Sequence, residues 1–317
     1  MSMGTRITRT PRVAAVIVTC NRRDVIARAL ETLAAQTRPV DDVIVVDNGS
    51  RDGTQALLET QYPHVHLIEM GDNAGPSVGF GAGMRAAYDR GADWLWMFND
   101  DMAVQPDALR DCLSYLGNVD GDDLGIACPW NKTDGKINRG YYWRGRAFKI
   151  SRVYDRPYQA DLVIFNAALV SRRLVERIGV IRPDLFMGYW EWEYCLRAKK
   201  AGFTVWILPF IALEHGTLGS RRGSTPAWRH YYNSRNQLRL AIEMRSPGQA
   251  YWWLVRQAGL TAAALWSRRL SRIESIWMVL RGGLDAVLGR MGKTIEPEKY
   301  RVTHARRYQR VPSAREA

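Results

Sequence analysis

The sequence predicts an α/β protein with a doubly wound, mainly parallel sheet, followed by a C-terminal helical extension. Apolar runs rich in β-branched or aromatic residues occupy 13–19, 43–46 and 94–98, and such runs are typical of strands buried on both faces. Segments with helical spacing lie between them, at 24–36 and 79–90. Because strands alternate with helices, parallel pairing through helical crossovers is the expected connection.

The other elements are expected from the same patterns. Residues 131–158 are polar and aromatic with many Gly and Arg, so we expect a long loop or hairpin at the rim of a site. From residue 228 onward the chain is expected to be mostly helical. The remaining expected bounds are helices at 54–60, 106–116, 171–178 and 190–201, and strands at 65–70, 163–165 and 205–213.

Charge divides the chain into two regions. The net charge is +13, and residues 221–317 carry 19 Lys and Arg against 6 Asp and Glu, so the whole excess lies in this last third. We therefore expect a catalytic domain at 1–220 and a basic, amphipathic helical region at 221–317. A basic block of this kind usually meets an anionic partner.

Cysteine usage and the first residues indicate a cytoplasmic protein. The four cysteines show no CxxC spacing and are expected to be reduced core thiols. Residues 1–12 are basic and polar, without the apolar stretch of a signal peptide, so secretion is not expected.

Polar and acidic clusters follow three of the expected strands. Because parallel strands present their carboxyl ends along one edge of the sheet, these clusters are expected to meet in one ligand site. Each cluster alone is equally consistent with an ordinary turn or helix cap. The clusters are Thr19-Cys20-Asn21, Asp47-Asn48 and Asn99-Asp100-Asp101.

The acidic turn 99–101 is suited to a hard divalent cation, Mn²⁺ or Mg²⁺, held together with substrate phosphates. Such a cation would neutralise charge on a departing diphosphate. Asp47 and Asn48 offer an acceptor and an amide for a base edge or ribose. The glycine-rich stretch 73–83 allows backbone to approach a phosphate or sugar. It is neither a GxGxxG after the first strand nor a Walker loop, which argues against a Rossmann dehydrogenase and a P-loop enzyme.

The segment Trp190-Glu191-Trp192-Glu193 opens an expected helix. A carboxylate between indoles lies in a partly apolar setting, which raises its pKa and suits a general base. The other reading is a helix start that favours acids. His215 follows an expected strand and is open to three readings: a metal ligand, a phosphate contact or an ordinary surface histidine.

The order of these motifs resembles that of family 2 glycosyltransferases with the GT-A fold. The resemblance covers residues 12–217 and rests on Val-Thr-Cys-Asn, Val-Asp-Asn-Gly-Ser-Arg-Asp-Gly-Thr, the Asn73 glycine run, Asn-Asp-Asp and Trp-Glu-Trp-Glu-Tyr-Cys-Leu-Arg. Within the family, residues 73–84 and 91–96 look most like actinobacterial galactofuranosyltransferases that start the cell-wall galactan. Bacterial rhamnosyltransferases are the next most similar group.

The resemblance implies an inverting, metal-dependent transfer by single in-line displacement at the anomeric carbon. Glu191 would be the general base, and Asp101 with His215 would bind Mn²⁺ or Mg²⁺. Asn99 and Glu191 depart from the family pattern, since many members carry Asp at both positions. The implied donor-binding residues are Thr19, Asn21, Asp47, Asn48, Asn73, Gly75, Asn99 and Asp100, and the expected acceptor-binding residues are Trp190, Trp192, Glu193 and Arg235.

The basic region predicts an acceptor or membrane contact. Residues 251–266 form an aromatic and alanine-rich helix, and residues 273–288 carry a second apolar stripe at helical spacing. The uncharged run 257–267 is too short to span a bilayer. Arg opposite Trp and Leu suits a helix in the interface of an anionic membrane, and the alternative is a helical pair packed on the protein itself or in a homodimer. The basic pair 221–222 and Arg235 are expected to contact the diphosphate of a polyprenyl-linked acceptor.

The expected activity is transfer of galactofuranose, or next rhamnose, from UDP-galactofuranose or dTDP-rhamnose to a lipid-linked glycan in cell-envelope polysaccharide synthesis. The expected place is the inner face of the cell membrane, as a peripheral protein. One rival is a nucleotidyltransferase, which would show a glycine-rich loop with Arg and Lys directly after the first strand. Another is a non-catalytic basic protein for nucleic acid or membrane, and the helical stripes of aromatics disfavour nucleic acid.

Overall fold

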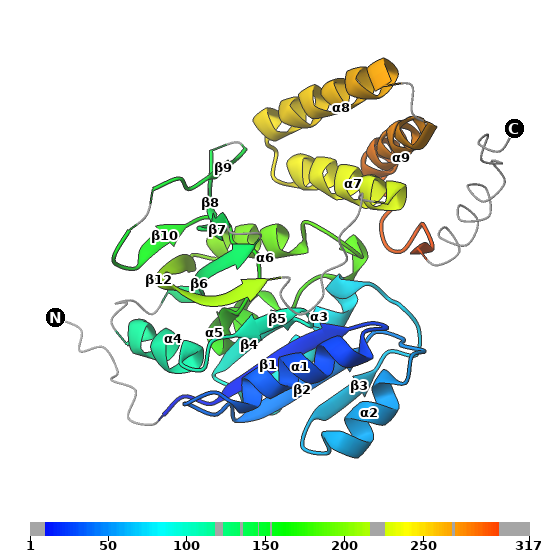
Figure 1. The fold of residues 1–317 in the computed structure, drawn as a ribbon. Coiled ribbons are helices and arrows are strands. Elements are labelled where there is room, and N and C mark those ends of the chain that lie inside the picture. The colour runs from blue at the N-terminus through cyan, green and yellow to red at the C-terminus, as the bar shows by residue number, and fades with distance from the viewer. Residues whose placement is uncertain are drawn as a thin grey trace, which may run out of the picture. The chain divides into compact units, whose positions relative to one another are not determined.

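A computed structural model describes residues 10–117, 123–133, 136–144, 146–152, 154–215, 226–267 and 270–297. The chain divides into two compact units, each drawn in Figure 1. The first comprises residues 1–183 with 189–222, and the second comprises 184–188 with 223–317. That the first is the catalytic domain and the second an acceptor or membrane region stays a prediction.

The first unit is built on a sheet with the strand order β10-β12-β6-β11-β4-β1-β2-β3. Strands β3, β2, β1 and β4 form its parallel half, as the apolar runs predicted. β1 lies at the centre of this half, between β2 and β4. The bounds are β1 Val13–Thr19, β2 Asp42–Asp47, β3 His66–Glu69 and β4 Trp94–Asn99.

The other half of the sheet is mixed, so the prediction of a mainly parallel sheet needs correction. β11 runs antiparallel to both of its neighbours, β4 and β6. β12 is parallel to β6 but antiparallel to β10 and β5. β8 and β9 form a separate hairpin. The bounds are β5 Met102–Val104, β6 Leu124–Thr133, β7 Lys136–Asn138, β8 Tyr141–Trp143, β9 Ala147–Lys149, β10 Tyr158–Ala160, β11 Ala168–Ser171 and β12 Thr204–His215.

Helices cover both faces of the parallel half, which confirms the doubly wound arrangement (Figure 1). Alternate side chains of β1 point to opposite faces. Val13, Ala15 and Ile17 pack in one apolar cluster with buried residues of α1, α2 and α4. On the other face, α3 lies directly against β1. The bounds are α1 Arg23–Ala34, α2 Thr54–Gln61, α3 Pro76–Asp89, α4 Ala108–Leu116, α5 Arg172–Ile178 and α6 Trp190–Lys200, with a 3₁₀ turn at Pro183–Leu185.

The close approach of α3 depends on its glycines. A Cβ added at Gly83 would lie 2.4 Å from a methyl carbon of Val16, and one at Gly79 would lie 2.8 Å from a methyl carbon of Val18. A side chain at either position would therefore push the helix off the sheet. This contact fixes α3 close behind the carboxyl end of β1.

The second unit is helical, as expected. It comprises α7 Ala227–Glu243, α8 Pro247–Ser267 and α9 Leu270–Val287. Its core contains Phe186, Trp228, Tyr231, Tyr232, Met278 and Ile295. Over the part of the chain that the structure describes, each helix is too short or too polar to cross a membrane.

Two expected elements differ from the structure. Residues 163–165 are not a strand but precede a bend at Ala167, whose φ of +58° is left-handed, and the strand begins only at Ala168. The expected helix 79–90 begins earlier, at Pro76, whose fixed φ suits a first helical turn.

Candidate active site

The carboxyl ends of three strands meet at one edge of the sheet, as predicted. In the parallel register Thr19 of β1 lies beside Asp47 of β2, and Val18 lies beside Asn99 of β4. The loops that follow β1, β2 and β4 therefore begin at the same edge of the sheet. The backbone N–H of Asn48 donates to the carbonyl of Thr19 at 2.8 Å, which ties the two loops together.

The acidic turn after β4 is buried and held by two donors. Asp100 and Asp101 are only 6% and 7% exposed. The Thr19 hydroxyl donates to Asp100 Oδ2 at 2.8 Å. Arg22 Nη1 lies 2.9 Å from Asp100 Oδ1 and 3.1 Å from Asp101 Oδ2, so a single guanidinium nitrogen bridges the two carboxylates. Burial raises the pKa of Asp100, while the charge of Arg22 opposes that rise.

The chemistry of this donor set fits a divalent cation. Two buried carboxylates supply hard oxygen ligands, and Mg²⁺ or Mn²⁺ completes its shell with water and phosphate oxygens. Within the described residues no group of three metal-ligating side chains occurs. The backbone of His215 pairs with Met102, one residue past Asp101, but its side chain lies outside the described residues. That His215 is a metal ligand therefore stays a prediction.

The loop after β2 is organised by Asp47, which is fully buried. Its carboxylate accepts from the backbone N–H of Ser50 at 3.2 Å and from the Ser50 hydroxyl. The same hydroxyl oxygen accepts from the backbone N–H of Asn21 at 2.8 Å, and Asn21 Oδ1 accepts from the N–H of Arg51 at 2.7 Å. The loops after β1 and β2 are thereby joined into one wall of the site.

The glycine-rich turn before α3 joins the same wall. Asn48 Oδ1 accepts from the backbone N–H of Ala74 at 3.0 Å, and its amide nitrogen lies 3.4 Å from Asn73 Oδ1. Asn73 Oδ1 accepts from the N–H of Gly75 at 3.0 Å. Gly75 has φ +87° and precedes the first turn of α3, so the helix N-terminus starts at this wall. The structure therefore brings the predicted donor-binding residues together.

Sequence reasoning missed a chain of three asparagines. Asn99 Nδ2 reaches Asn166 Oδ1 at 3.5 Å, and Asn166 Nδ2 donates to Asn131 Oδ1 at 3.1 Å. Asn131 and Asn166 are 2% and 4% exposed. Buried amides are costly unless bonded, so this chain rigidifies the side of the acidic turn that faces β6. In the sequence, the available sign of these buried amides was that Asn131 and Asn166 follow apolar stretches.

The start of α6 presents Glu191 next to this edge. Trp190 stacks on Phe80 of α3 with ring centroids 4.7 Å apart and meets the edge of Phe165 at 5.6 Å. Phe165 immediately precedes Asn166, which bonds to Asn99, so the first turn of α6 is anchored beside the acidic turn. Glu191 is half-buried, and burial raises the pKa of its carboxyl to about 7.

Two of the three residues of this segment that were predicted to bind the acceptor have structural positions instead. Trp190 is 4% exposed and belongs to the core between α3 and the loop 163–167. Glu193 is 4% exposed, and its carboxylate oxygens accept from Arg197 Nε at 3.0 Å and Nη2 at 3.1 Å. Trp192 is only partly buried, and its ring lies 5.2 Å from that of Tyr141. Trp192 therefore remains the aromatic candidate for a sugar contact.

The prediction that Arg235 binds the acceptor also needs correction. Arg235 is completely buried in the second unit. Its guanidinium donates to the carbonyls of Gly292 at 2.7 Å and Leu185 at 3.1 Å, and lies over the rings of Tyr231 and Tyr232. These carbonyl and ring contacts satisfy the charge, so Arg235 supports the fold. The predicted basic pair 221–222 lies outside the described residues.

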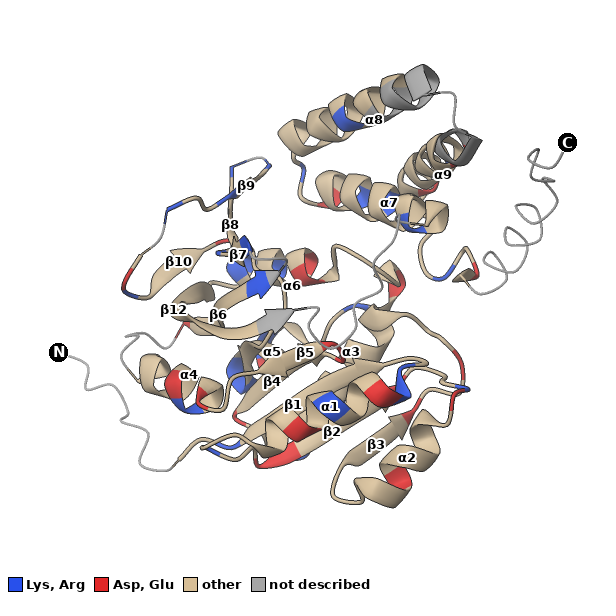
Figure 2. Cartoon of the chain, in the orientation of Figure 1, with Lys and Arg blue, Asp and Glu red and all other residues tan. Residues whose placement is uncertain are grey.

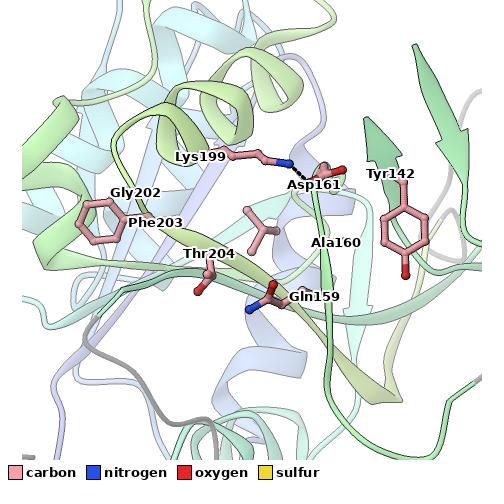
Figure 3. Close-up of a pocket in the computed structure, with 9 residues that line it drawn as sticks. Tyr142, Gln159, Ala160, Asp161, Lys199, Gly202, Phe203 and Thr204 are labelled. Atoms are coloured by element: carbon pink, nitrogen blue, oxygen red, sulfur yellow. Dashed lines mark hydrogen bonds and ion pairs between the residues drawn. The ribbon is translucent and has the colours of Figure 1, made fainter. Parts of the chain in front are cut away.

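A separate surface pocket of about 270 Å³ lies at the other end of β12 (Figure 3). Thr204, the first residue of β12, lines it with Tyr142 and Gln159, and an ion pair joins Lys199 to Asp161 at its rim. Because the acidic turn adjoins the last residue of β12, this pocket is not part of the candidate site.

The comparisons with known proteins agree with this geometry. The family model "Glycosyl transferase family 2" matches residues 14–179. Galactofuranosyltransferase GlfT1 of Mycobacterium tuberculosis (strain ATCC 25618 / H37Rv) is 33% identical over 218 residues, 63% of this chain and 67% of that protein. The dTDP-rhamnosyl transferase RfbF of Shigella flexneri is 28% identical over 180 residues, 55% of this chain and 59% of that protein.

Solved structures support the fold. Mannosyltransferase PcManGT from Pyrobaculum calidifontis, in complex with GDP-Man and Mn²⁺, superposes with a TM-score of 0.55 at 16% identity and covers 88% of each chain. S. aureus TarS 1–349 in complex with UDP gives 0.53 at 15% identity, over 73% of this chain and 65% of that one. Since the family model spans more than half of the chain, this protein belongs to glycosyl transferase family 2 and has the GT-A fold.

Proposed function

We propose that this glycosyltransferase is inverting and metal-dependent and transfers galactofuranose, or next rhamnose, to a hydroxyl of a lipid-linked glycan. The observation that carries the proposal is Glu191, a carboxyl with a pKa of about 7 at the start of a helix anchored beside a buried acidic turn. A general base works best when its pKa lies near the working pH. The nearby buried carboxylates supply the charge needed for a metal and a diphosphate.

The chain's own residues then perform a single displacement. Glu191 takes the proton from the acceptor hydroxyl as its oxygen attacks the anomeric carbon. The bond to the nucleoside diphosphate breaks from the opposite side, its electron pair leaves with the phosphate oxygen, and the configuration inverts. Thr19 holds Asp100 in place, while Asp47, Asn48 and the Asn73–Gly75 turn bind the nucleotide.

Asp100, Asp101 and His215 would hold Mn²⁺ or Mg²⁺. The bound ion would neutralise charge on the leaving diphosphate. PcManGT, which shares the fold, was solved with GDP-Man and Mn²⁺, and this supports the choice of metal.

The sugar is inferred from two relatives. GlfT1 and RfbF are named for galactofuranose and dTDP-rhamnose, and their alignments cover 63% and 55% of this chain. We therefore propose UDP-galactofuranose as the favoured donor and dTDP-rhamnose as the next. Cell-envelope polysaccharide synthesis is the corresponding role.

A lipid-linked acceptor explains the surface of the second unit. Large apolar side chains are exposed on α8 and α9, among them Tyr251 at 61%, Trp277 at 56% and Leu284 at 58%. Lys and Arg far outnumber Asp and Glu in residues 221–317, and the blue segments on α7 and α8 in Figure 2 show some of them. Apolar and basic surface together suit the interface of an anionic membrane. We propose peripheral binding to the inner face of the cell membrane.

Donor turnover tests the proposal directly. UDP-galactofuranose, dTDP-rhamnose, UDP-glucose and GDP-mannose are incubated with the full chain and a polyprenyl-diphosphate glycan, with Mn²⁺ and with EDTA. We expect transfer of galactofuranose or rhamnose that EDTA abolishes. Product of retained anomeric configuration, or equal turnover in EDTA, would contradict the mechanism.

A further inference from the structure

Arg22 contacts both carboxylates of the acidic turn through one guanidinium nitrogen. It lies in the loop after β1 and directly precedes the first residue of α1. Its Nη1 lies 2.9 Å from Asp100 Oδ1 and 3.1 Å from Asp101 Oδ2. The remaining Asp100 oxygen accepts from Thr19, so the pair is oriented from two sides.

The charges of the acidic turn explain why the guanidinium of Arg22 lies beside it. The side chains of Asp100 and Asp101 are 9% and 10% exposed, and two adjacent buried carboxylates repel one another. The guanidinium offsets this repulsion at the place where a divalent cation would bind. The two cations repel each other in turn, so a metal can take these oxygens only as Arg22 withdraws.

Arg22 has another anion to bind when it withdraws. Its side chain is 20% exposed and has a long, rotatable stem, so it can turn away from the two carboxylates without any change in the backbone. A donor diphosphate bound to the metal would lie within reach, and the planar guanidinium fork matches phosphate oxygens. The side chain of the next residue, Arg23, is exposed.

We propose that Arg22 is a resident cation of the acidic turn, which releases Asp100 and Asp101 when metal and donor bind and then holds the donor diphosphate. This inference rests on the proposed metal-dependent function. It makes Arg22 a donor-binding residue and predicts that metal and nucleotide bind synergistically, because each offsets the cost of moving Arg22.

Manganese binding to the full chain tests the exchange, with free Mn²⁺ measured by electron paramagnetic resonance with and without UDP. Without UDP, Arg22→Gln should bind Mn²⁺ about tenfold more tightly than the wild type, since the competing cation is gone. UDP should tighten Mn²⁺ binding by about tenfold or more in the wild type and by far less in Arg22→Gln. Arg23→Gln removes the same charge one residue away and should match the wild type in both measurements.

Arg22→Lys covers the case in which Arg22→Gln does not fold. Lysine keeps the charge but lacks the fork, so Mn²⁺ affinity alone should stay near the wild-type value while the effect of UDP falls. If the wild type binds Mn²⁺, two results would overturn the proposed exchange without touching the metal-dependent function. The first is an Arg22→Gln variant that binds Mn²⁺ as Arg23→Gln does. The second is an Arg22→Lys variant in which UDP tightens Mn²⁺ binding as much as in the wild type. A wild type that binds no Mn²⁺ even with UDP overturns the metal-dependent function and the exchange with it.

Discussion

Glu191 and Glu193 stand two residues apart in the first turn of α6, yet their surroundings give them opposite roles. Glu193 is paired with Arg197, a charge partner that its burial requires. Glu191 forms no ion pair with any residue that the structure describes, and burial raises the pKa of its carboxyl to about 7. The same residue type thus serves the fold at one position and, in our proposal, the reaction at the other.

Replacing Glu191 by Gln should abolish transfer while leaving donor binding nearly unchanged. Loss of a general base costs about 10²- to 10⁴-fold in rate, and the amide keeps the shape of the side chain. Initial rates with the active donor and a UDP titration measure the two effects. The wild-type rate should rise with pH through about 7, as Glu191 loses its proton.

Glu193→Gln is the matched control for that measurement. It leaves Arg197 without its carboxylate partner, while Arg197 keeps the carbonyls of Ile178 and Val180. Stability should therefore fall by about 1–2 kcal/mol, whereas the folded fraction should retain transfer. Equal rates for Glu191→Gln and the wild type would remove Glu191 as the base.

Glu191 should also make stability depend on pH. Its folded pKa of about 7 lies above the ordinary value of 4.5, so the folded state binds a proton that the unfolded state releases earlier. Its stabilising contribution is therefore complete below about pH 4.5 and is lost as pH rises through 7. Urea midpoints from pH 4 to 8 should fall more steeply for the wild type than for Glu191→Gln; parallel curves would contradict the raised pKa.

At the residue scale, the sequence was a better guide to the chemistry of a side chain than to the direction in which that side chain points. Trp190, Glu193 and Tyr194 follow the i, i+3, i+4 spacing of one helix face, and that face is buried. The spacing was available in the sequence and separates Trp190 and Glu193 from Glu191. Arg22 was less accessible, because only the tertiary fold brings residues 22 and 100 together.

At the scale of elements, α3 shows how a helix without large side chains can be fixed. Gly83 faces Val16 and Val46, and a Cβ there would lie 2.4 Å and 3.2 Å from their methyl carbons. Because α3 begins at the Asn73–Gly75 turn, this packing also sets the position of the nucleotide wall. The glycines of α3 therefore allow close packing of the helix on the sheet, in addition to any contact between the backbone and a phosphate.

Gly83→Ala should destabilise the protein by about 1–3 kcal/mol, since overpacking outweighs the better helix propensity of Ala. Gly259→Ala in α8 is the control, because a Cβ there meets nothing within 4 Å. It should raise stability by about 0.5–1 kcal/mol. Chemical denaturation measures both; a Gly83→Ala variant as stable as the wild type would show that α3 can move.

The error at residues 163–165 has a physical origin. Both this segment and β11 are apolar and buried, so hydrophobicity does not separate them. The bend is imposed at Ala167, whose carbonyl accepts from Trp96 Nε1 at 3.1 Å. A left-handed alanine held by a distant indole leaves no local pattern in the sequence.

At the scale of the whole molecule, residue composition predicted a boundary at residue 220, and the roles of the two regions stay predictions. The pairing of strands that are distant in the sequence could not be predicted from composition. Runs at 13–19, 43–46 and 94–98 gave the parallel half because its strands are joined by short crossovers. β11 was not predicted between β4 and β6, since an antiparallel insertion depends on the backbone partners that tertiary structure supplies.

Substitution of exposed residues tests membrane binding better than deletion of residues 246–317. Tyr231 and Met278 share a core, so deletion would uncover the buried face of α7. Changing Trp277, Leu280 and Leu284 to Ser should reduce binding to phosphatidylglycerol vesicles by about 100-fold, at about 1 kcal/mol for each side chain. Vesicle co-sedimentation measures the change.

Phe148→Ser in β9 removes an apolar side chain that is 37% exposed in the first unit and should leave vesicle binding unchanged. High salt should weaken binding of the wild type, because the attraction to anionic lipid is screened. A stable dimer in light scattering that binds no vesicles would assign the face on α8 and α9 to a second copy of the chain.

The place of β11 also has a consequence for synthesis on the ribosome. Every strand of the parallel half has been made once residue 99 is translated, but the free edge of β4 gains its partner only when Ala168–Ser171 emerge. During that interval the nascent chain displays an unpaired edge bearing Leu95, Trp96 and Met97. Open apolar edges recruit other chains, so we expect folding yield to depend on how quickly translation delivers β11.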